Sequence, residues 1–141
     1  ATAILMPVSC RRQLFDLSDD MATKIDIQFY LDAKDALLKA IEDEGLMAHA
    51  ECIGALIRQL FAEALAGAKG VVEIRGHGLM IGVELDRPCG VLVGKALEAG
   101  LLINVTGDTV VRLLPPLNFS EAEARELVER CAPLIREFLA G

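Results

Sequence analysis

The sequence predicts an α+β domain in which helices cover a small, mostly antiparallel sheet. Two observations support this fold class. Apolar residues recur at the three- and four-residue spacing of helices in residues 33–41, 46–65 and 120–140. Short apolar runs, bounded by glycine and proline, fill residues 71–85 and 101–114, as is typical of strands. Helices that flank pairs of neighbouring strands indicate a layered α+β arrangement.

The first part of the chain does not follow this pattern. A short strand is expected in residues 1–8, ended by Pro7. A second strand is expected in residues 25–29, where apolar and polar residues alternate. We therefore predict an atypical N-terminal segment of residues 1–31, followed by a domain of residues 32–141.

Two helices open the predicted domain. The first follows Asp32 and ends at Gly45, and the second spans residues 46–65 and ends in a glycine-rich turn. Cys52 in the second helix and Cys131 in the last helix fall on apolar stretches, so both are expected to be core thiols.

The first pair of strands is predicted in residues 71–74 and 79–85, with a turn at residues 75–78 that contains two glycines. The second of these strands has apolar residues at successive positions. We therefore expect it to be buried on both faces, with Met80 as a core residue.

The second pair of strands follows a short helix in residues 90–99. Strands are expected in residues 101–105 and 110–114, joined by a hairpin turn at residues 106–109. The last helix begins after Ser120, and the glutamate three positions later completes a capping box.

Composition limits the classes of function. The 141 residues carry a net charge of −7, and the basic stripe typical of nucleic-acid-binding proteins is not visible. No apolar run reaches the roughly 18 residues of a membrane-spanning helix. The apolar start of the chain lacks a preceding basic segment and is a poor signal peptide. We therefore expect no nucleic-acid or membrane partner and a cytoplasmic location.

Metal ligation is not expected either. The four cysteines lie far apart without a Cys-x-x-Cys pair, and the chain has two histidines. Free thiols in a cytoplasmic protein are the simplest interpretation.

Three motifs carry a family resemblance. They are R-G-H-G-L-M-I-G at residues 75–82, G-L-L-I-N at residues 100–104 and R-L-L-P-P-L at residues 112–117. Their order and spacing resemble the C-terminal small domain of class-III, pyridoxal-phosphate-dependent aminotransferases. Arg87-Pro88 and the Leu101 segment are most similar to the acetylornithine type. The resemblance extends from about residue 36 to the end of the chain and implies the fold of fold-type-I pyridoxal-phosphate enzymes.

The resemblance implies a role for one residue. In the intact enzyme Arg112 is expected to bind the α-carboxylate of the amino-acid substrate, through the paired hydrogen bonds of a guanidinium fork. From the pattern alone, a structural ion pair or an exposed strand end is an alternative for this arginine. No residue matches the family's Schiff-base lysine, so we predict no catalytic and no cofactor-binding residue in this chain, which is expected to be inactive alone.

Other residues that could suggest a site have simpler explanations. Lys95 lies in a run that superficially resembles the Schiff-base lysine segment, but it stands between the strand motif and the arginine motif and lacks the expected glycine. A solvated helix lysine is the preferred interpretation. Gly76 and Gly78 are expected to form a turn because a strand follows them, and His77 between them is expected to be exposed without an evident partner acid.

Two hypotheses of function follow. In the first, the chain is a fragment or C-terminal domain of an acetylornithine- or ornithine-type aminotransferase that acts in amino-acid metabolism such as arginine biosynthesis. In the second, it is a standalone non-catalytic module that reuses the domain. In either case a small domain without its large domain would expose an apolar face. We therefore expect a homo-oligomer, favouring a dimer with residues 1–31 in the interface.

Overall fold

The computed structural model describes residues 3–9, 26–43 and 45–141 of the chain. By their internal contacts the residues divide into two compact units, Ala1–Leu46 and Met47–Gly141. Cys10, one of the four cysteines, lies outside the described residues, as do Lys24 and Glu44.

The first unit is built on a pair of parallel strands. β1 (Ala3–Pro7) pairs with β2 (Asp26–Tyr30) in an unbroken register. Both strands were predicted, and their positions are confirmed. Helix α2 (Ala33–Asp43) follows, and Asp32 accepts a hydrogen bond from the amide of Asp35 at its start. The division between residues 31 and 32 stays a prediction.

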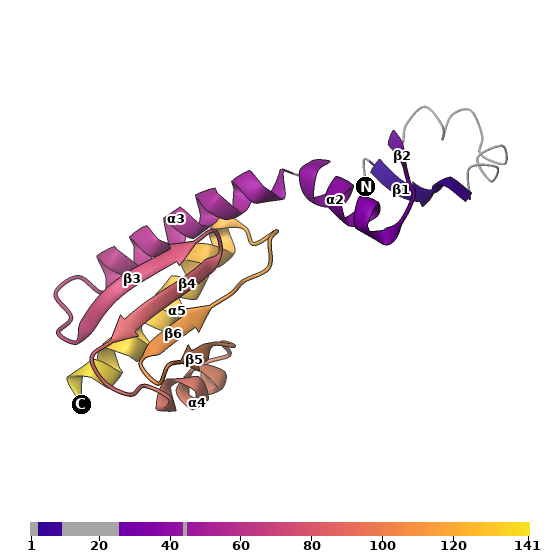
Figure 1. Cartoon of the computed structure of the whole chain (residues 1–141). Coiled ribbons are helices and arrows are strands. Elements are labelled where there is room, and N and C mark those ends of the chain that lie inside the picture. The colour runs from indigo at the N-terminus through magenta and orange to yellow at the C-terminus, as the bar shows by residue number, and fades with distance from the viewer. Residues whose placement is uncertain (1–2, 10–25, 44) are drawn as a thin grey trace. The chain divides into compact units, whose positions relative to one another are not determined.

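The second unit contains the predicted antiparallel sheet. Its strand order is β3-β4-β6-β5, and all three neighbouring pairs are antiparallel. The strands are β3 (Val71–His77), β4 (Met80–Leu85), β5 (Asn104–Thr106) and β6 (Val110–Leu113). Together with the helices they confirm the α+β fold class (Figure 1).

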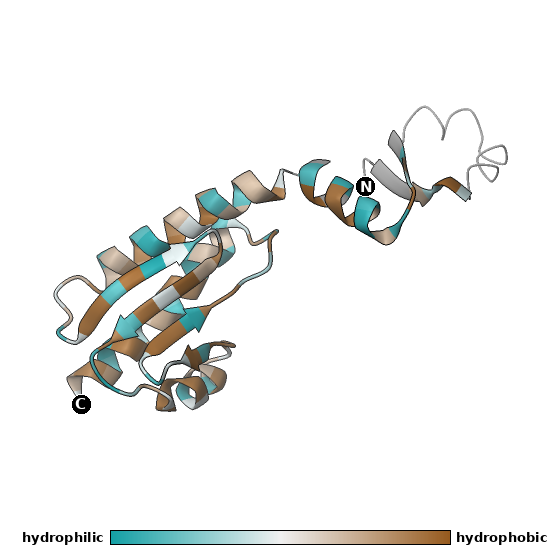
Figure 2. Cartoon of the chain, viewed as in Figure 1, coloured by the Kyte–Doolittle hydropathy of each residue, from teal (hydrophilic) through white to brown (hydrophobic). Residues whose placement is uncertain are grey.

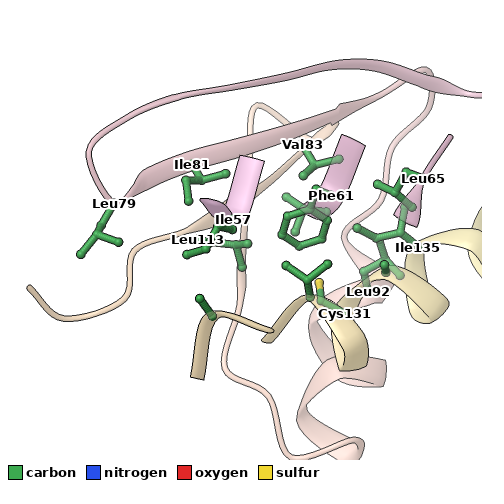
Figure 3. Packing of buried hydrophobic residues seen from close by; sticks show 14 of the residues in the cluster. Ile57, Phe61, Leu65, Leu79, Ile81, Val83, Leu92, Leu113, Cys131 and Ile135 are labelled. Atoms are coloured by element: carbon green, nitrogen blue, oxygen red, sulfur yellow. The ribbon is translucent and has the colours of Figure 1, made fainter. Parts of the chain in front are cut away.

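Two long helices cover one face of this sheet. In Figure 1, α5 (Glu121–Ala140) passes behind the strands, α3 (Leu46–Ala64) runs alongside β3, and the short α4 (Val91–Glu98) lies near β5. The core forms between the helices and the sheet, where Ile57 and Phe61 of α3 meet Val83 of β4 and Ile135 of α5 (Figure 3). All four side chains are fully buried.

The prediction that β4 is buried on both faces is wrong. Ile81, Val83 and Leu85 are buried, whereas Met80 is 56% exposed, so burial alternates along the strand. The physical reason is that α3 and α5 lie on the same face, so within the described second unit no helix covers the opposite face of the sheet. We call this opposite face the outer face. Along β3 the alternation of hydrophobic and hydrophilic residues is visible in Figure 2.

The first hairpin is also tighter than predicted. His77 pairs with Met80, so β3 runs through most of the predicted turn and Gly78 and Leu79 form the connection. Gly78 has a φ of 51°, which a glycine adopts without steric cost.

Of the two cysteines predicted to lie in the core, Cys131 is buried and Cys52 is exposed. On α3 the buried positions include Ala50, Ile53 and Ile57, and Cys52 points away from this stripe. Burial raises the pKa of the Cys131 thiol to about 12.

Local signals of the second hairpin and the last helix are confirmed. Gly107 and Asp108 both have positive φ angles at the turn between β5 and β6. The preceding strand begins three residues later than predicted, at Asn104. Ser120 and Glu123 form the predicted capping box at the start of α5. Within the described part of the chain, no helix combines the length and apolarity needed to span a membrane.

Candidate functional site

The outer face of the sheet carries a row of four residues in register. Arg75 of β3 pairs with Gly82 of β4, Gly82 pairs with Arg112 of β6, and Arg112 pairs with Asn104 of β5. Directly opposed residues in an antiparallel pair project to the same face. Gly82 alternates with the buried Ile81 and Val83, so this row faces away from the core. Two arginines therefore flank a glycine on the outer face.

A hollow of about 390 Å³ lies over this row. Its volume falls within the range of small-molecule sites. Arg75, His77, Gly82 and Arg112 line it together with the apolar side chains of Met80 and Val110. The hollow thus combines basic groups with an apolar surface, an arrangement that suits a ligand with a carboxylate and a carbon chain.

The charge of Arg75 is compensated inside the domain. Its Nη1 donates to Glu84 and, at 2.8 Å, to Oε2 of Glu73. The hydrogen bond to Glu84, followed by that to Glu73, raises the pKa of the Arg75 guanidinium. Sequence reasoning missed this cluster. The available signal was the two-residue spacing of Glu73 and Arg75, which places both side chains on one face of a strand. Only the hairpin register shows that Glu84 lies beside them.

Arg112 differs from Arg75 because its side chain forms no ion pair with any described residue. It is exposed on a strand whose neighbours Val111 and Leu113 are buried on the other face. The structural ion pair, one alternative for Arg112, is therefore not observed among the described residues. Its guanidinium can donate hydrogen bonds to a carboxylate from outside the domain.

Of the other sequence candidates, Lys95 lies away from the hollow and His77 lies at it. Lys95 pairs with Glu137 of α5 at 3.3 Å and does not line the hollow. His77 is exposed as predicted, but it has an acidic neighbour, since its Nδ1 lies 3.3 Å from Oε1 of Glu51. This partner was missed because it comes from α3. The His77 side chain is 91% exposed, so the pair is weak.

Metal ligation finds no support in the described ranges. No group of three or more histidine, cysteine, aspartate or glutamate residues there could hold a metal ion.

The comparisons with known proteins identify the family of the chain. The family model for aminotransferase class-III matches residues 31–135. Acetylornithine aminotransferase 1 of Bordetella parapertussis is 57% identical over 105 residues, which cover 74% of this chain and 27% of that protein. Acetylornithine aminotransferase of Nitrosomonas europaea is 47% identical over 102 residues, which cover 72% of this chain and 26% of that protein.

Solved structures show the same relationship. Ornithine delta-aminotransferase of Plasmodium falciparum superposes with a TM-score of 0.68 at 30% identity, over 75% of this chain and 28% of that one. N-acetylornithine aminotransferase of Stenotrophomonas maltophilia gives a TM-score of 0.66 at 30% identity, over 77% and 30%.

Fold, motifs and relatives together define a class-III aminotransferase domain, and the chain belongs to that family. Within the family it is similar to the acetylornithine aminotransferases. The chain spans about a quarter of the length of the curated relatives it matches.

The family depends on pyridoxal phosphate, which forms a Schiff base with a lysine. The hollow does not fit this cofactor by itself. Its lining includes arginines and a histidine, but no lysine among the described residues. The nearest family-like candidate, Lys95, is tied to Glu137.

Proposed function

We propose that this chain is the C-terminal small domain of an acetylornithine-type aminotransferase, and that it supplies the group that binds the substrate carboxylate. The observation that carries the proposal is the position of Arg112. It is exposed over the hollow, and its side chain has no ionic partner among the described residues. The fragment status of the chain, its activity in amino-acid metabolism and its amino-acid substrate are parts of this proposal.

Arg112 binds and orients the substrate in this proposal. Its planar guanidinium donates two parallel hydrogen bonds to the two carboxylate oxygens, which fixes the direction of the carbon chain. Arg75 competes less for the carboxylate, because its charge is compensated by Glu84 and Glu73, to which its Nη1 donates. The carboxylate is therefore held at one defined point, and the amino group at the other end is held at a defined distance from it.

Pyridoxal phosphate supplies the electron sink for amino-group transfer in the intact enzyme. In our proposal it is held by residues outside the described hollow. The small domain closes one wall of the cleft and orients the substrate.

The experiment is a chimera. Residues 31–135 of this chain replace the matching segment of the Bordetella parapertussis relative. The purified enzyme is assayed with acetylornithine and 2-oxoglutarate. Arg112→Lys keeps the charge but loses the fork, and Arg112→Ala loses both. A hydrogen bond to a charged group contributes about 1.5–3 kcal/mol. We therefore expect kcat/KM for acetylornithine to fall about 10- to 150-fold in both Arg112 variants.

A matched control is Arg125→Lys. Arg125 is an exposed arginine of α5 whose Nη2 pairs with Oε1 of Glu121 at 2.6 Å, away from the hollow. Its kinetics should equal those of the parent chimera. An active chimera in which Arg112→Ala retains the parental KM for acetylornithine would show that Arg112 does not bind the substrate.

The second candidate is a standalone non-catalytic module. It is favoured by the β1–β2 pair, which lies in the part of the chain that the family model does not match. The genomic sequence upstream of this reading frame distinguishes the two. A large domain readable in another frame supports the enzyme piece, and an unrelated, clean start supports the module.

A further inference from the structure

We propose that Gly82 determines which substrates reach Arg112. Because glycine has no side chain, it leaves room in the hollow for the carbon chain of the bound substrate. This inference rests on the proposed role of Arg112. It adds a specificity-determining residue, which admits amino acids with an unbranched chain next to the carboxylate.

The register places Gly82 at the centre of the hollow. Arg75 and Arg112 stand on either side of it on neighbouring strands. Strands lie about 4.8 Å apart, so the Cα atoms of the two arginines are separated by about 10 Å. The side chain of any larger residue at position 82 would fill the space between the side chains of Arg75 and Arg112.

The backbone does not require a glycine at this position. Gly82 does not belong to the glycines with positive φ, in contrast to Gly78 at the nearby turn. A glycine in a central strand weakens the sheet and often marks a site where a ligand or another backbone approaches closely. The φ angle therefore gives no reason for glycine, whereas the side chains that stand beside the position do.

The contacts that an added methyl group would make support the same view. A Cβ on Gly82 would lie 3.1 Å from Cγ1 of Val110 and 4.0 Å from Cγ of Arg75, which are both side-chain atoms. By contrast, a Cβ on Gly76 would lie 2.5 Å from the backbone oxygen of Met80. Gly76 is thus needed by the fold, whereas an alanine at position 82 requires the Val110 side chain to shift by a few tenths of an ångström.

The surroundings define the ligand. The carboxylate binds at Arg112, and the adjoining carbons lie over Gly82 against the side chains of Met80 and Val110. A branch on the first carbons of this chain would compete with Val110 for the same space. An unbranched aliphatic chain fits, which agrees with the linear carbon chain of acetylornithine.

The first test uses the full 141-residue chain and needs no activity. Phenylglyoxal, which modifies accessible arginines, is applied to the parent and to Gly82→Ala and Gly82→Val, and the modification rates are followed by peptide mass spectrometry. We expect the rate at Arg112 to fall about tenfold in Gly82→Val, as expected when methyl groups fill a pocket. The rate at the exposed Arg125 of α5 controls for the reactivity of the reagent and should not change, and circular dichroism confirms that each variant is folded. An unchanged Arg112 rate would contradict the inference.

The second test uses the chimera described above. For acetylornithine, kcat/KM is expected to fall about tenfold in Gly82→Ala and about a hundredfold in Gly82→Val, mainly through KM. The matched control is Gly94→Ala on α4, where a Cβ meets nothing within 4 Å. Its kinetics should match those of the parent.

The outcomes separate the two proposals. If Arg112→Lys lowers kcat/KM but both Gly82 variants behave like the parent, the role of Gly82 is wrong and that of Arg112 stands. If the Arg112 variants have no effect either, both proposals are wrong. If the chimera does not assemble, the labelling rates of Arg112 in the full chain decide the role of Gly82.

Discussion

The tightest contact between helix and sheet gives a prediction whose sign is not obvious. Gly54 lies in the interior of α3 and is buried against the turn between β3 and β4. A Cβ on Gly54 would lie 1.9 Å from the carbonyl oxygen of Gly78 and 2.6 Å from its carbonyl carbon. Both are backbone atoms, so the substitution Gly54→Ala forces the helix and the turn apart.

Two opposing effects decide the result. Alanine is about 1 kcal/mol more favourable than glycine inside a helix. Overpacking of a well-packed contact costs about 1–3 kcal/mol, and more when backbone has to move. The methyl group falls about 1 Å short of the 3.0 Å below which real Cβ atoms essentially never approach another atom. The clash therefore lies at the upper end of the range, and we expect a net loss of about 1–2 kcal/mol.

The free energy of unfolding is measured by urea denaturation, followed by circular dichroism at 222 nm. Gly94→Ala is the control, because it lies in a helix with open space around its Cβ position. It should stabilise by about 1 kcal/mol, opposite in sign to Gly54→Ala. If both variants were stabilised equally, the close approach of α3 to Gly78 would be refuted.

Four further predictions follow from other parts of the chain. Ser120→Ala removes the capping box of α5 and should lower the free energy of unfolding by about 1 kcal/mol in urea at pH 7. The hydrogen bonds from Ser120 lower the pKa of Glu123 from its ordinary value of 4.5. Their contribution to the free energy of unfolding is therefore present above pH 4.5 and is lost as the pH falls through the pKa of Glu123 in the folded chain. The gap between parent and variant should therefore narrow in denaturation curves recorded at successively lower pH. Phe61→Ala empties a fully buried site and should cost about 3–5 kcal/mol by the same measurement. The chain mixed with pyridoxal phosphate, acetylornithine and 2-oxoglutarate should form no glutamate, and a borohydride-trapped adduct on Lys95 would contradict this. Light scattering should show a dimer that aggregates when residues 1–31 are deleted, and a soluble monomer in both cases would refute the pairing.

The candidate site was predictable in part. Arg112 was identified because its motif was visible in the sequence, and the structure places it over a hollow. Arg75 and Gly82 were missed because their relation to Arg112 depends on the register of two strand pairs. Register changes which residues stand side by side without changing the sequence signal of any single strand.

Errors in burial have a similar cause. Met80 and Cys52 are apolar residues within apolar stretches, and both were expected in the core. Whether such a residue is buried depends on which face its neighbours cover, and α3 and α5 cover the same face of the sheet. Hydrophobicity alone does not contain that information.

The sequence by itself determined the elements whose signals are local. The capping box at Ser120, the hairpin turn at Gly107 and Asp108, and the apolar period of α3 depend on residues within a few positions of one another. The tertiary structure decided which face of the sheet the helices cover and which side chains meet on the other. Arg75, Gly82 and Arg112 form one row because the β3–β4 hairpin pairs in a particular register with β6, which follows β4 in the chain only after α4 and β5. Pairing with such a distant segment is set by the packing of the whole domain.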